Sequence, residues 1–220
     1  MGINLGDAFP NFKAQTTAGE MQFYDFVGDS WAILFSHPAD YTPVCTTELG
    51  RVVQLVPEFK KRGVKLAALS CDDVESHKGW AEDIKSYVKN EEGFPYPIIA
   101  DPSRELAVQL GMVDPDEKDA AGLPLTCRAV FIIGPDKKLK LSMLYPATTG
   151  RNFNEILRVL DSLQLTATKK VATPVDWKQG DEAMVVPSVK PEDCATLFPK
   201  GVRVQAVPSG KQYLRFTTDY

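Results

Sequence analysis

Short apolar runs alternate with amphipathic segments along much of the chain. Residues 31–35 contain no polar residue, as expected for a β-strand covered on both faces of a sheet. Similar runs at residues 64–69, 129–133 and 139–144 predict three more strands. The last two runs are joined by Gly134-Pro135 and are therefore expected to form a hairpin.

Between the predicted strands, apolar residues recur at the three- and four-residue spacing of helices that bury one face. Gly63 and Gly93 are placed as the stops of the first two helices. Strands that alternate with helices, followed by a hairpin, predict an α/β fold with a central mixed sheet flanked by helices. The helices are predicted around residues 49–56, 80–88, 103–111 and 153–163.

The hydrophobic pattern of the sequence changes near residue 168. After this point prolines separate short segments, and no long periodic element follows. We therefore predict a main domain over residues 1–168 and a small C-terminal α+β extension over residues 169–220. This extension is either a tail wrapped over its own domain or a small domain that meets another subunit. The periodicity of the sequence does not decide between these alternatives.

The composition narrows the range of partners. The net charge of −4 gives no global excess of positive charge for nucleic acid or an anionic membrane surface. No stretch approaches the roughly 18 apolar residues of a membrane span, so stable membrane insertion is not expected. Small molecules and other proteins are the expected partners.

The four cysteines are widely scattered, which favours a reducing compartment and a cytoplasmic location. The sequence has no Cys-x-x-Cys pair and no group of Cys and His at zinc-ligand spacing. These absences argue against a dithiol oxidoreductase and a structural zinc site. Thiol chemistry would therefore have to start from a single cysteine.

Cys45 has the strongest local signal for such chemistry. Thr42 followed by Pro43 is typical of a helix start, because a threonine side chain can cap free backbone N–H groups and proline suits the first helical position. Cys45 then falls in the first turn, where free N–H groups and the helix dipole stabilise a thiolate. The other three cysteines lack this setting and are interpreted as ordinary small residues: Cys71, Cys127 and Cys194.

The segments 35–38 and 42–49 resemble the active-site signature of peroxiredoxins, Pro-x-x-x-(Thr/Ser)-x-x-Cys. The likeness covers nearly the whole chain and is greatest to the one-cysteine peroxiredoxins, the peroxiredoxin six class. It implies a thioredoxin-like fold whose C-terminal extension assists formation of a homodimer. Further matching segments are residues 104–107, 134–139, 145–152 and 172–177.

The resemblance also implies roles for individual residues. Cys45 would be the peroxidatic nucleophile, Thr42 would hydrogen-bond the peroxide and Cys45, and Pro38 would shield the site. Arg128 would stabilise the thiolate, although an isolated arginine is more commonly a surface ion-pair residue. His37 would donate a hydrogen bond or titrate within the site, and its alternative is a packed histidine at a strand end.

His77 lies beside Lys78, on what the pattern predicts to be a polar helix face. We therefore expect no catalytic part for it.

The reaction implied for such a site needs no metal or organic cofactor. Cys45 would attack a hydroperoxide, leaving water or an alcohol and a sulfenic acid on the enzyme. Two-cysteine relatives resolve this acid with a cysteine in a Val-Cys-Pro segment, but here Thr173 precedes Pro174. An external thiol such as glutathione is therefore the expected reductant, with Cys194 as a conceivable substitute. Hydrogen peroxide, alkyl hydroperoxides and phospholipid hydroperoxides all remain open as substrates.

Two other functions compete with the peroxidase. Relatives described as phospholipases have a serine in Gly-Asp-Ser-Trp-Gly, a histidine shortly before it and a later aspartate. This chain has Ser30 in the segment 28–32 and keeps Asp136, but Ala32 breaks the glycine pattern and Tyr24 replaces the histidine. Tyrosine is a poor general base at neutral pH, so hydrolysis is disfavoured. The third alternative is a holdase or redox-signalling partner that is oxidised without turnover.

Overall fold

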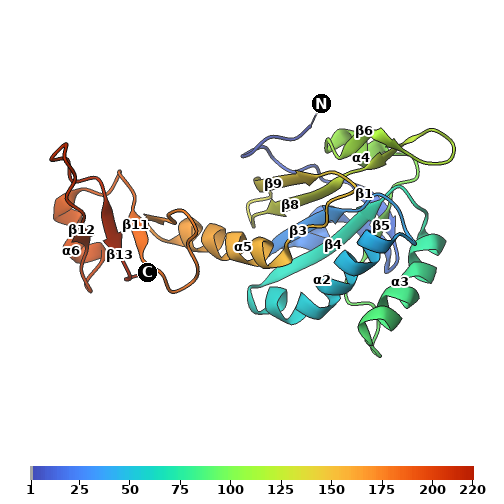
Figure 1. Ribbon diagram of the computed structural model, residues 1–220, viewed down its shortest axis with the longest axis horizontal. Coiled ribbons are helices and arrows are strands. Elements are labelled where there is room, and N and C mark those ends of the chain that lie inside the picture. The colour runs from blue at the N-terminus through green and yellow to red at the C-terminus, as the bar shows by residue number, and fades with distance from the viewer. Residues whose placement is uncertain (1) are drawn as a thin grey trace. The chain divides into compact units, whose positions relative to one another are not determined.

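The computed structural model describes residues 2–220 (Figure 1). The chain divides into two compact units, one ending at Phe153 and the other comprising Asn154–Tyr220. The helix α5 (Phe153–Thr168) supplies the first part of the second unit. The change in sequence composition near residue 168 coincides with the C-terminal end of this helix.

The first unit is built on a seven-stranded mixed sheet with the strand order β2-β1-β5-β4-β3-β8-β9. The central strands β3 and β4 are parallel, β5 is parallel to β4, and β8 runs antiparallel to β3 and β9. The four strands predicted from apolar runs are confirmed as β3, β4, β8 and β9. The strands are β1 (Lys13–Thr16), β2 (Gly19–Gln22), β3 (Trp31–Ser36), β4 (Val64–Ser70), β5 (Ile98–Ala100), β8 (Arg128–Ile133) and β9 (Leu139–Tyr145).

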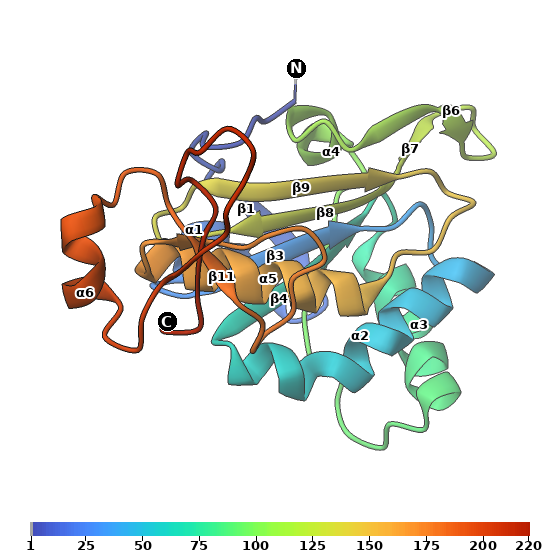
Figure 2. The same cartoon turned by 60° about the vertical axis from the view of Figure 1, so that its left-hand side comes forward.

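The predicted helices are present, with one boundary corrected. Figures 1 and 2 both show α2 and α3 side by side along one face of the sheet. The first helix stops as predicted, because Gly63 follows it with a φ of 63°. The prediction that Gly93 stops α3 is wrong, since Lys89 adopts the left-handed conformation and ends the helix earlier. The helices are α1 (Phe23–Val27), α2 (Pro43–Lys61), α3 (Val74–Val88) and α4 (Glu105–Gln109).

The core of the first unit fills the space between the sheet and its covering elements. Phe12 and Phe23 stack with ring centroids 4.7 Å apart, and Phe9 lies 5.2 Å from Phe23. All three rings pack with buried residues of the central strands. The hairpin of β6 (Val113–Lys118) and β7 (Pro124–Thr126) forms a separate two-stranded sheet.

The register of the central strands brings two distant segments to the same place. Phe35 of β3 pairs with Val130 of the antiparallel strand β8. The first residue of β8, Arg128, therefore lies beside the end of β3. Ser36 reinforces this junction by accepting a hydrogen bond from the backbone N–H of Ala129 at 3.0 Å. The chain that leaves β3 toward α2 thus meets Arg128.

The second unit is a small α+β unit with its own core, as the sequence predicted for the extension. Its four-stranded sheet has the order β10-β11-β13-β12, and its buried cluster includes Val171, Val185 and Phe198. Within residues 2–220, neither unit contains a helix that is both long and apolar enough to cross a membrane. The short elements of the second unit are β10 (Val171–Ala172), β11 (Ala183–Val185), the 3₁₀ helix Pro191–Asp193, α6 (Cys194–Leu197), β12 (Arg203–Val204) and β13 (Arg215–Thr217).

Candidate active site

Cys45 lies in the first turn of α2, and the residue is completely buried. The helix begins at Pro43 after Thr42, as the sequence predicted. The expected cap is wrong in one respect, because the Thr42 hydroxyl does not accept a hydrogen bond from the helix. It donates instead to the carbonyl of Ala39 at 2.8 Å, which folds the preceding loop back on itself. The first turn therefore keeps free N–H groups close to the sulfur.

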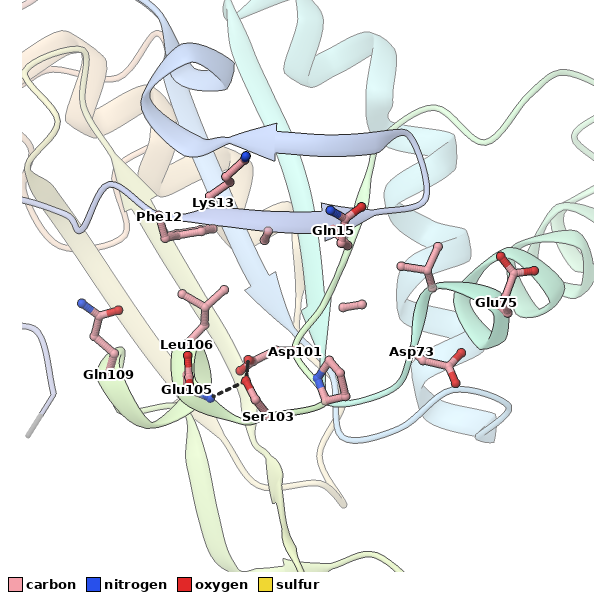
Figure 3. A pocket seen from close by; sticks show the side chains of 14 residues that line it. Phe12, Lys13, Gln15, Asp73, Glu75, Asp101, Ser103, Glu105, Leu106 and Gln109 are labelled. Atoms are coloured by element: carbon pink, nitrogen blue, oxygen red, sulfur yellow. Dashed lines mark hydrogen bonds between the residues drawn. The ribbon is translucent and has the colours of Figure 1, made fainter.

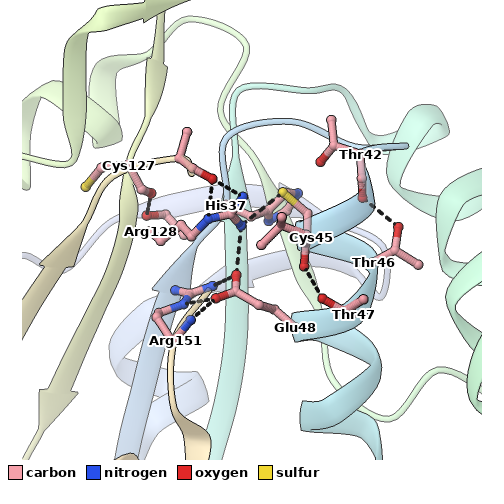
Figure 4. A network of polar contacts seen from close by, with 12 residues as sticks. His37, Thr42, Cys45, Thr46, Thr47, Glu48, Cys127, Arg128 and Arg151 are labelled. Carbon is pink, nitrogen blue, oxygen red and sulfur yellow. Dashed lines mark hydrogen bonds and ion pairs between the residues drawn. The ribbon is translucent and has the colours of Figure 1, made fainter. Parts of the chain in front are cut away.

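Arg128 reaches the sulfur of Cys45 from the neighbouring strand β8 (Figure 4). Its Nη1 donates to Cys45 Sγ at 3.3 Å and to Glu48 Oε2 at 2.8 Å. Its Nε and Nη2 both donate to the carbonyl of Ala147, at 2.9 and 2.6 Å. Arg128 is only 3% exposed, so the interpretation as a surface ion-pair residue is wrong. Four hydrogen bonds hold the guanidinium against the thiol.

Glu48 and Arg151 complete this cluster, and sequence analysis missed both as site residues. Glu48 lies three residues after Cys45 and therefore on the same helix face. Its Oε1 accepts from the backbone N–H and Nε of Arg151 at 2.6 and 3.0 Å, and its Oε2 accepts from Nη2 at 2.7 Å. Arg151 also lies over the Phe35 ring, 5.7 Å from its centroid. The segment 145–152 resembled the family, but no residue pattern singled out Arg151.

The charge balance of this cluster favours an anion at the sulfur. Burial by itself raises the pKa of a carboxyl group. The hydrogen bonds and charge of Arg151, together with the charge of Arg128, nevertheless hold the pKa of Glu48 below its usual value. Glu48 is thus a carboxylate, and two guanidinium groups face a single negative charge. The remaining positive charge lies next to Cys45.

His37 lies at the end of β3 and is completely buried. Its Nε2 is 2.8 Å from Asp40 Oδ1, and its ring centroid is 4.8 Å from that of Trp80. The Trp80 indole N–H donates in turn to the hydroxyl of Thr46, the residue after Cys45. Burial lowers the pKa of His37, although the hydrogen bond and charge of Asp40 oppose this shift. His37 is therefore a neutral side chain at neutral pH.

A second histidine joins the same network. His77 Nδ1 lies 2.7 Å from Asp40 Oδ2, and its Nε2 lies 3.2 Å from the carbonyl oxygen of Ile99. The prediction that His77 occupies a polar helix face is wrong, because the side chain is fully buried. Burial raises the pKa of a carboxyl, but the hydrogen bonds from His37 and His77 bring the pKa of Asp40 well below its usual range.

Within residues 2–220, the side chains of His37, Asp40 and His77 form the group whose atoms come close enough to bind a metal ion. The N···O separations of 2.8 and 2.7 Å are hydrogen-bond distances. Two ligands at about 2.1 Å from a tetrahedral ion would be roughly 3.4 Å apart. The geometry therefore places protons between these atoms.

The remaining predicted residues lie where the fold dictates. Pro38 is buried in the loop between β3 and α2, on the same segment as Thr42. Burial raises the pKa of Cys71 to about 11 and also raises the pKa of Cys127. Cys194 belongs to the second unit and is partly exposed. Of the four thiols, only Cys45 receives a hydrogen bond from Arg128.

The residues of the competing hydrolase are not assembled as a triad. The Tyr24 hydroxyl donates to the carbonyl of Phe9 at 2.6 Å, and Asp136 pairs with Lys140 at 2.6 Å. Among the residues that the structure describes, the hydroxyl of Ser30 forms no hydrogen bond with either Tyr24 or Asp136. These contacts give Ser30 no general base.

A pocket of about 650 Å³ lies away from this cluster, between β1 and the beginnings of α3 and α4 (Figure 3). Its lining includes Phe12, Lys13, Asp73, Asp101 and Leu106. None of the five predicted site residues lines it. This pocket therefore does not coincide with the cluster around Cys45.

A thiol at a helix N-terminus within reach of a fixed guanidinium is placed to act as a nucleophile, as the reactive centre of a thiol-dependent peroxidase requires. Comparisons with known proteins agree with this class. The family model "AhpC/TSA family" matches residues 5–142, and the model "C-terminal domain of 1-Cys peroxiredoxin" matches residues 162–200. The chain therefore belongs to the peroxiredoxins, of the one-cysteine class, and it is a thiol-dependent peroxidase.

Individual relatives cover almost the full length of the chain. Peroxiredoxin-6 of Gallus gallus is 66% identical over 98% of this chain and 97% of its own length, and that of Homo sapiens is 64% identical over the same shares. The solved C45S mutant of peroxiredoxin 6 of Arenicola marina is 67% identical. It covers 100% of this chain and 99% of its own, with a TM-score of 0.97.

A yeast mitochondrial 1-Cys peroxiredoxin has a TM-score of 0.86 and 43% identity, covering 98% of this chain and 99% of its own. The predicted thioredoxin-like fold is confirmed by these structures.

Proposed function

We propose that Cys45 is the nucleophile that reduces hydrogen peroxide and organic hydroperoxides, with phospholipid hydroperoxides among the candidate substrates. The sulfur attacks the terminal oxygen of the peroxide, the O–O bond breaks, and a sulfenic acid forms. The departing oxygen carries the electron pair away and leaves as water or an alcohol after it gains a proton. The single observation that carries this proposal is the 3.3 Å contact between Arg128 Nη1 and Cys45 Sγ.

The buried charges around the sulfur stabilise the negative charge that the reaction moves from one atom to another. Negative charge resides on the sulfur before attack and on the departing oxygen afterwards. The guanidinium of Arg128 is fixed by Glu48 and Ala147, so it can stabilise both anions without reorganising. The Thr42 hydroxyl donates its proton in a hydrogen bond to the carbonyl of Ala39. Its lone pairs are therefore free to accept a hydrogen bond from the peroxide.

Pro38 and His37 fit supporting roles in the same site. Pro38 is a buried apolar residue on the loop that precedes Cys45, where it would limit the access of water to the reacting sulfur. The His37 ring packs against Trp80, whose N–H donates to Thr46 in the first turn of α2. His37 would contribute one ring nitrogen to the reacting groups.

An external thiol, with glutathione as the candidate, would return the sulfenic acid to the thiol. The first thiol displaces water and forms a mixed disulfide, and a second thiol releases Cys45. Thr173 supports this proposal, because its hydroxyl pairs with Ser162 at 2.6 Å in the segment where two-cysteine relatives carry a resolving thiol. The yeast 1-Cys relative is described as resolving its thiol through glutathione and thioredoxin systems.

We further propose that the protein acts as a cytoplasmic homodimer. All four cysteines are free, which suits a reducing compartment. β9 forms an open edge of the large sheet, where Leu144 is 58% exposed. Apolar side chains at an unpaired strand edge are typical of surfaces that meet another subunit. Light scattering at micromolar concentration should give twice the mass of one chain.

Mass spectrometry after one equivalent of hydrogen peroxide tests the proposed chemistry. We expect one added oxygen on Cys45, and a glutathione adduct on the same residue when glutathione is present. Peroxide consumption should cease in Cys45→Ser and persist in Cys194→Ser. Undiminished turnover by Cys45→Ser, or oxidation that begins at Cys194, would contradict the assignment.

A further inference from the structure

The Asp40 carboxylate joins the loop before Cys45 to helix α3. It lies within hydrogen-bond distance of three side chains: His37 at 2.8 Å, His77 at 2.7 Å and Ser76 at 2.8 Å. The backbone N–H of Asp40 donates to the carboxylate of Asp72 at 3.0 Å. The Asp40 carboxylate is 1% exposed, so water does not compete with these contacts. Asp40 is held from both the strand end and the helix.

His77 holds Asp40 from the side of helix α3. Its Nδ1 faces the Asp40 carboxylate and its Nε2 faces the Ile99 carbonyl, and both partners only accept hydrogen bonds. His77 therefore bridges the Asp40 carboxylate and the backbone of β5, and it ties α3 to the loop before Cys45.

The hydrogen bond to Asp40 fixes the tautomer of His37. Its Nε2 faces the carboxylate of Asp40, so that nitrogen carries the proton. A second proton would place a charge on a completely buried ring, and burial lowers the pKa of His37. Nδ1 is therefore a bare acceptor. Within residues 2–220, Nδ1 of His37 is the buried side-chain N or O atom that lacks a partner.

A buried acceptor without a partner costs free energy unless another molecule satisfies it. The His37 ring packs on Trp80, whose N–H donates to Thr46 in the first turn of α2. The His37 side chain thus lies in the surroundings of Cys45 (Figure 4). The hydroxyl hydrogens that arise there during the reaction are those of the peroxide and of the sulfenic acid.

We propose that Asp40 and His77 are positioning residues for the peroxidase reaction, which hold His37 as the Nε2–H tautomer so that Nδ1 accepts a hydrogen bond from the peroxide or the sulfenic acid. Asp40 has a second effect through the backbone. Tyr41 adopts the left-handed region with a φ of 54°, which is costly for a tyrosine. The anchors on Asp40 keep this turn in place and thereby place Thr42. The inference rests on the proposed role of Cys45.

Nitrogen NMR on protein labelled with ¹⁵N-histidine tests the proton positions without reference to activity. The chain has two histidines, so two imidazole spin systems are expected. At pH 7 the His37 ring should carry a proton on Nε2 only. Asp40→Asn should abolish this preference. A His37 ring protonated on Nδ1 would overturn the inference.

Stopped-flow oxidation of Cys45 by hydrogen peroxide tests the functional consequence. Asp40→Asn should slow the oxidation by about tenfold or more, as expected for the loss of a charged hydrogen bond. Glu75→Gln is the matched control, because Glu75 is an exposed acid in the first turn of the same helix and should keep the wild-type rate.

His77 offers a graded pair of variants. His77→Gln keeps a donor for Asp40 and should retain most of the rate, whereas His77→Leu should behave like Asp40→Asn. Asp40→Asn and His77→Leu at the wild-type rate would refute the inference while the peroxidase proposal stands. A wild-type protein whose Cys45 resists peroxide would refute the peroxidase proposal itself, and the NMR pattern would still report the tautomers.

Discussion

The guanidinium of Arg151 binds both carboxylate oxygens of Glu48, with its Nε 3.0 Å from Oε1 and its Nη2 2.7 Å from Oε2. This bidentate contact leaves Glu48 a fixed acceptor for Arg128, whose Nη1 also contacts Cys45. Arg151 does not touch the sulfur in this arrangement. It stabilises the residue that orients the guanidinium beside the sulfur.

Replacing Arg151 should therefore affect both stability and rate. Arg151→Met leaves Glu48 buried with two fewer hydrogen bonds, since the backbone N–H of residue 151 remains, and breaking a buried ion pair in this way costs about 3–5 kcal/mol. Urea denaturation should show this loss of unfolding free energy. Arg158→Met is a suitable control, because the Arg158–Glu155 pair is partly exposed and its loss should cost less than about 1 kcal/mol. Equal losses for the two variants would contradict the buried network.

Arg128→Lys should reduce the rate of Cys45 oxidation by about 100-fold or more, as for removal of one donor from a preorganised anion site. Lysine keeps the charge but cannot contact the sulfur, Glu48 and Ala147 together, because it lacks the planar fork of donors. Stopped-flow kinetics over a range of peroxide concentrations provides the measurement. A rate within threefold of the wild type would show that charge alone suffices.

Two of the three buried thiols of the first unit, Cys71 and Cys127, should resist alkylation. Cys71, with its pKa raised to about 11, and Cys127, whose pKa is also raised by burial, remain protonated and unreactive at pH 7. Iodoacetamide followed by peptide mass spectrometry should find Cys194 modified before either of them, since Cys194 is partly exposed. Unfolding in urea should remove the difference. Early labelling of Cys71 in the folded protein would contradict the burial.

The free energy of unfolding should fall as the pH is lowered from 7.5. His37 has its folded pKa lowered below 6.5, so the unfolded chain takes up a proton first and stability declines below about pH 6.5. Asp40 and Glu48 have folded pKa values below their ordinary ones, so their contributions are complete above about pH 4.5 and are lost on further acidification. Urea titrations at pH 7.5, 5.5 and 4.0 measure this decline.

Asp40→Asn is the control for this pH dependence. It removes the hydrogen bond and the charge that raise the pKa of His37 against the effect of burial, so the folded pKa of His37 falls further and the share of His37 in the acid-induced loss of stability should grow. A wild-type stability that is constant over this interval would contradict the protonation states assigned to the network.

The sequence predicts the parts of the fold that rest on strong local signals. Apolar runs marked β3, β4, β8 and β9, since buried strands need uninterrupted side chains on both faces. The strands β1 and β2 were missed because KAQT and GEMQ are short and largely polar, and β5 has only three residues. Their pairing comes from the tertiary structure, which no short window of sequence contains.

The site shows the same division between local and tertiary information. Cys45 follows from the helix start at Thr42-Pro43, and Arg128 was reached only through resemblance to a family. Glu48 is visible in retrospect from its spacing to Cys45, whereas His77 depends on the packing of α3 against the loop that carries Asp40. A polar residue on a helix looks solvent-exposed in sequence when its partner is a distant buried carboxylate.

The complete burial of Cys45 sets an order of events in the catalytic cycle. Hydrogen peroxide is little larger than water and needs only a small local motion of the first turn to reach the sulfur. A reducing tripeptide is far bulkier, so the same turn must unwind before the sulfenic acid can be attacked. The frequency with which the first turn of α2 opens therefore limits how quickly the oxidised enzyme is reduced.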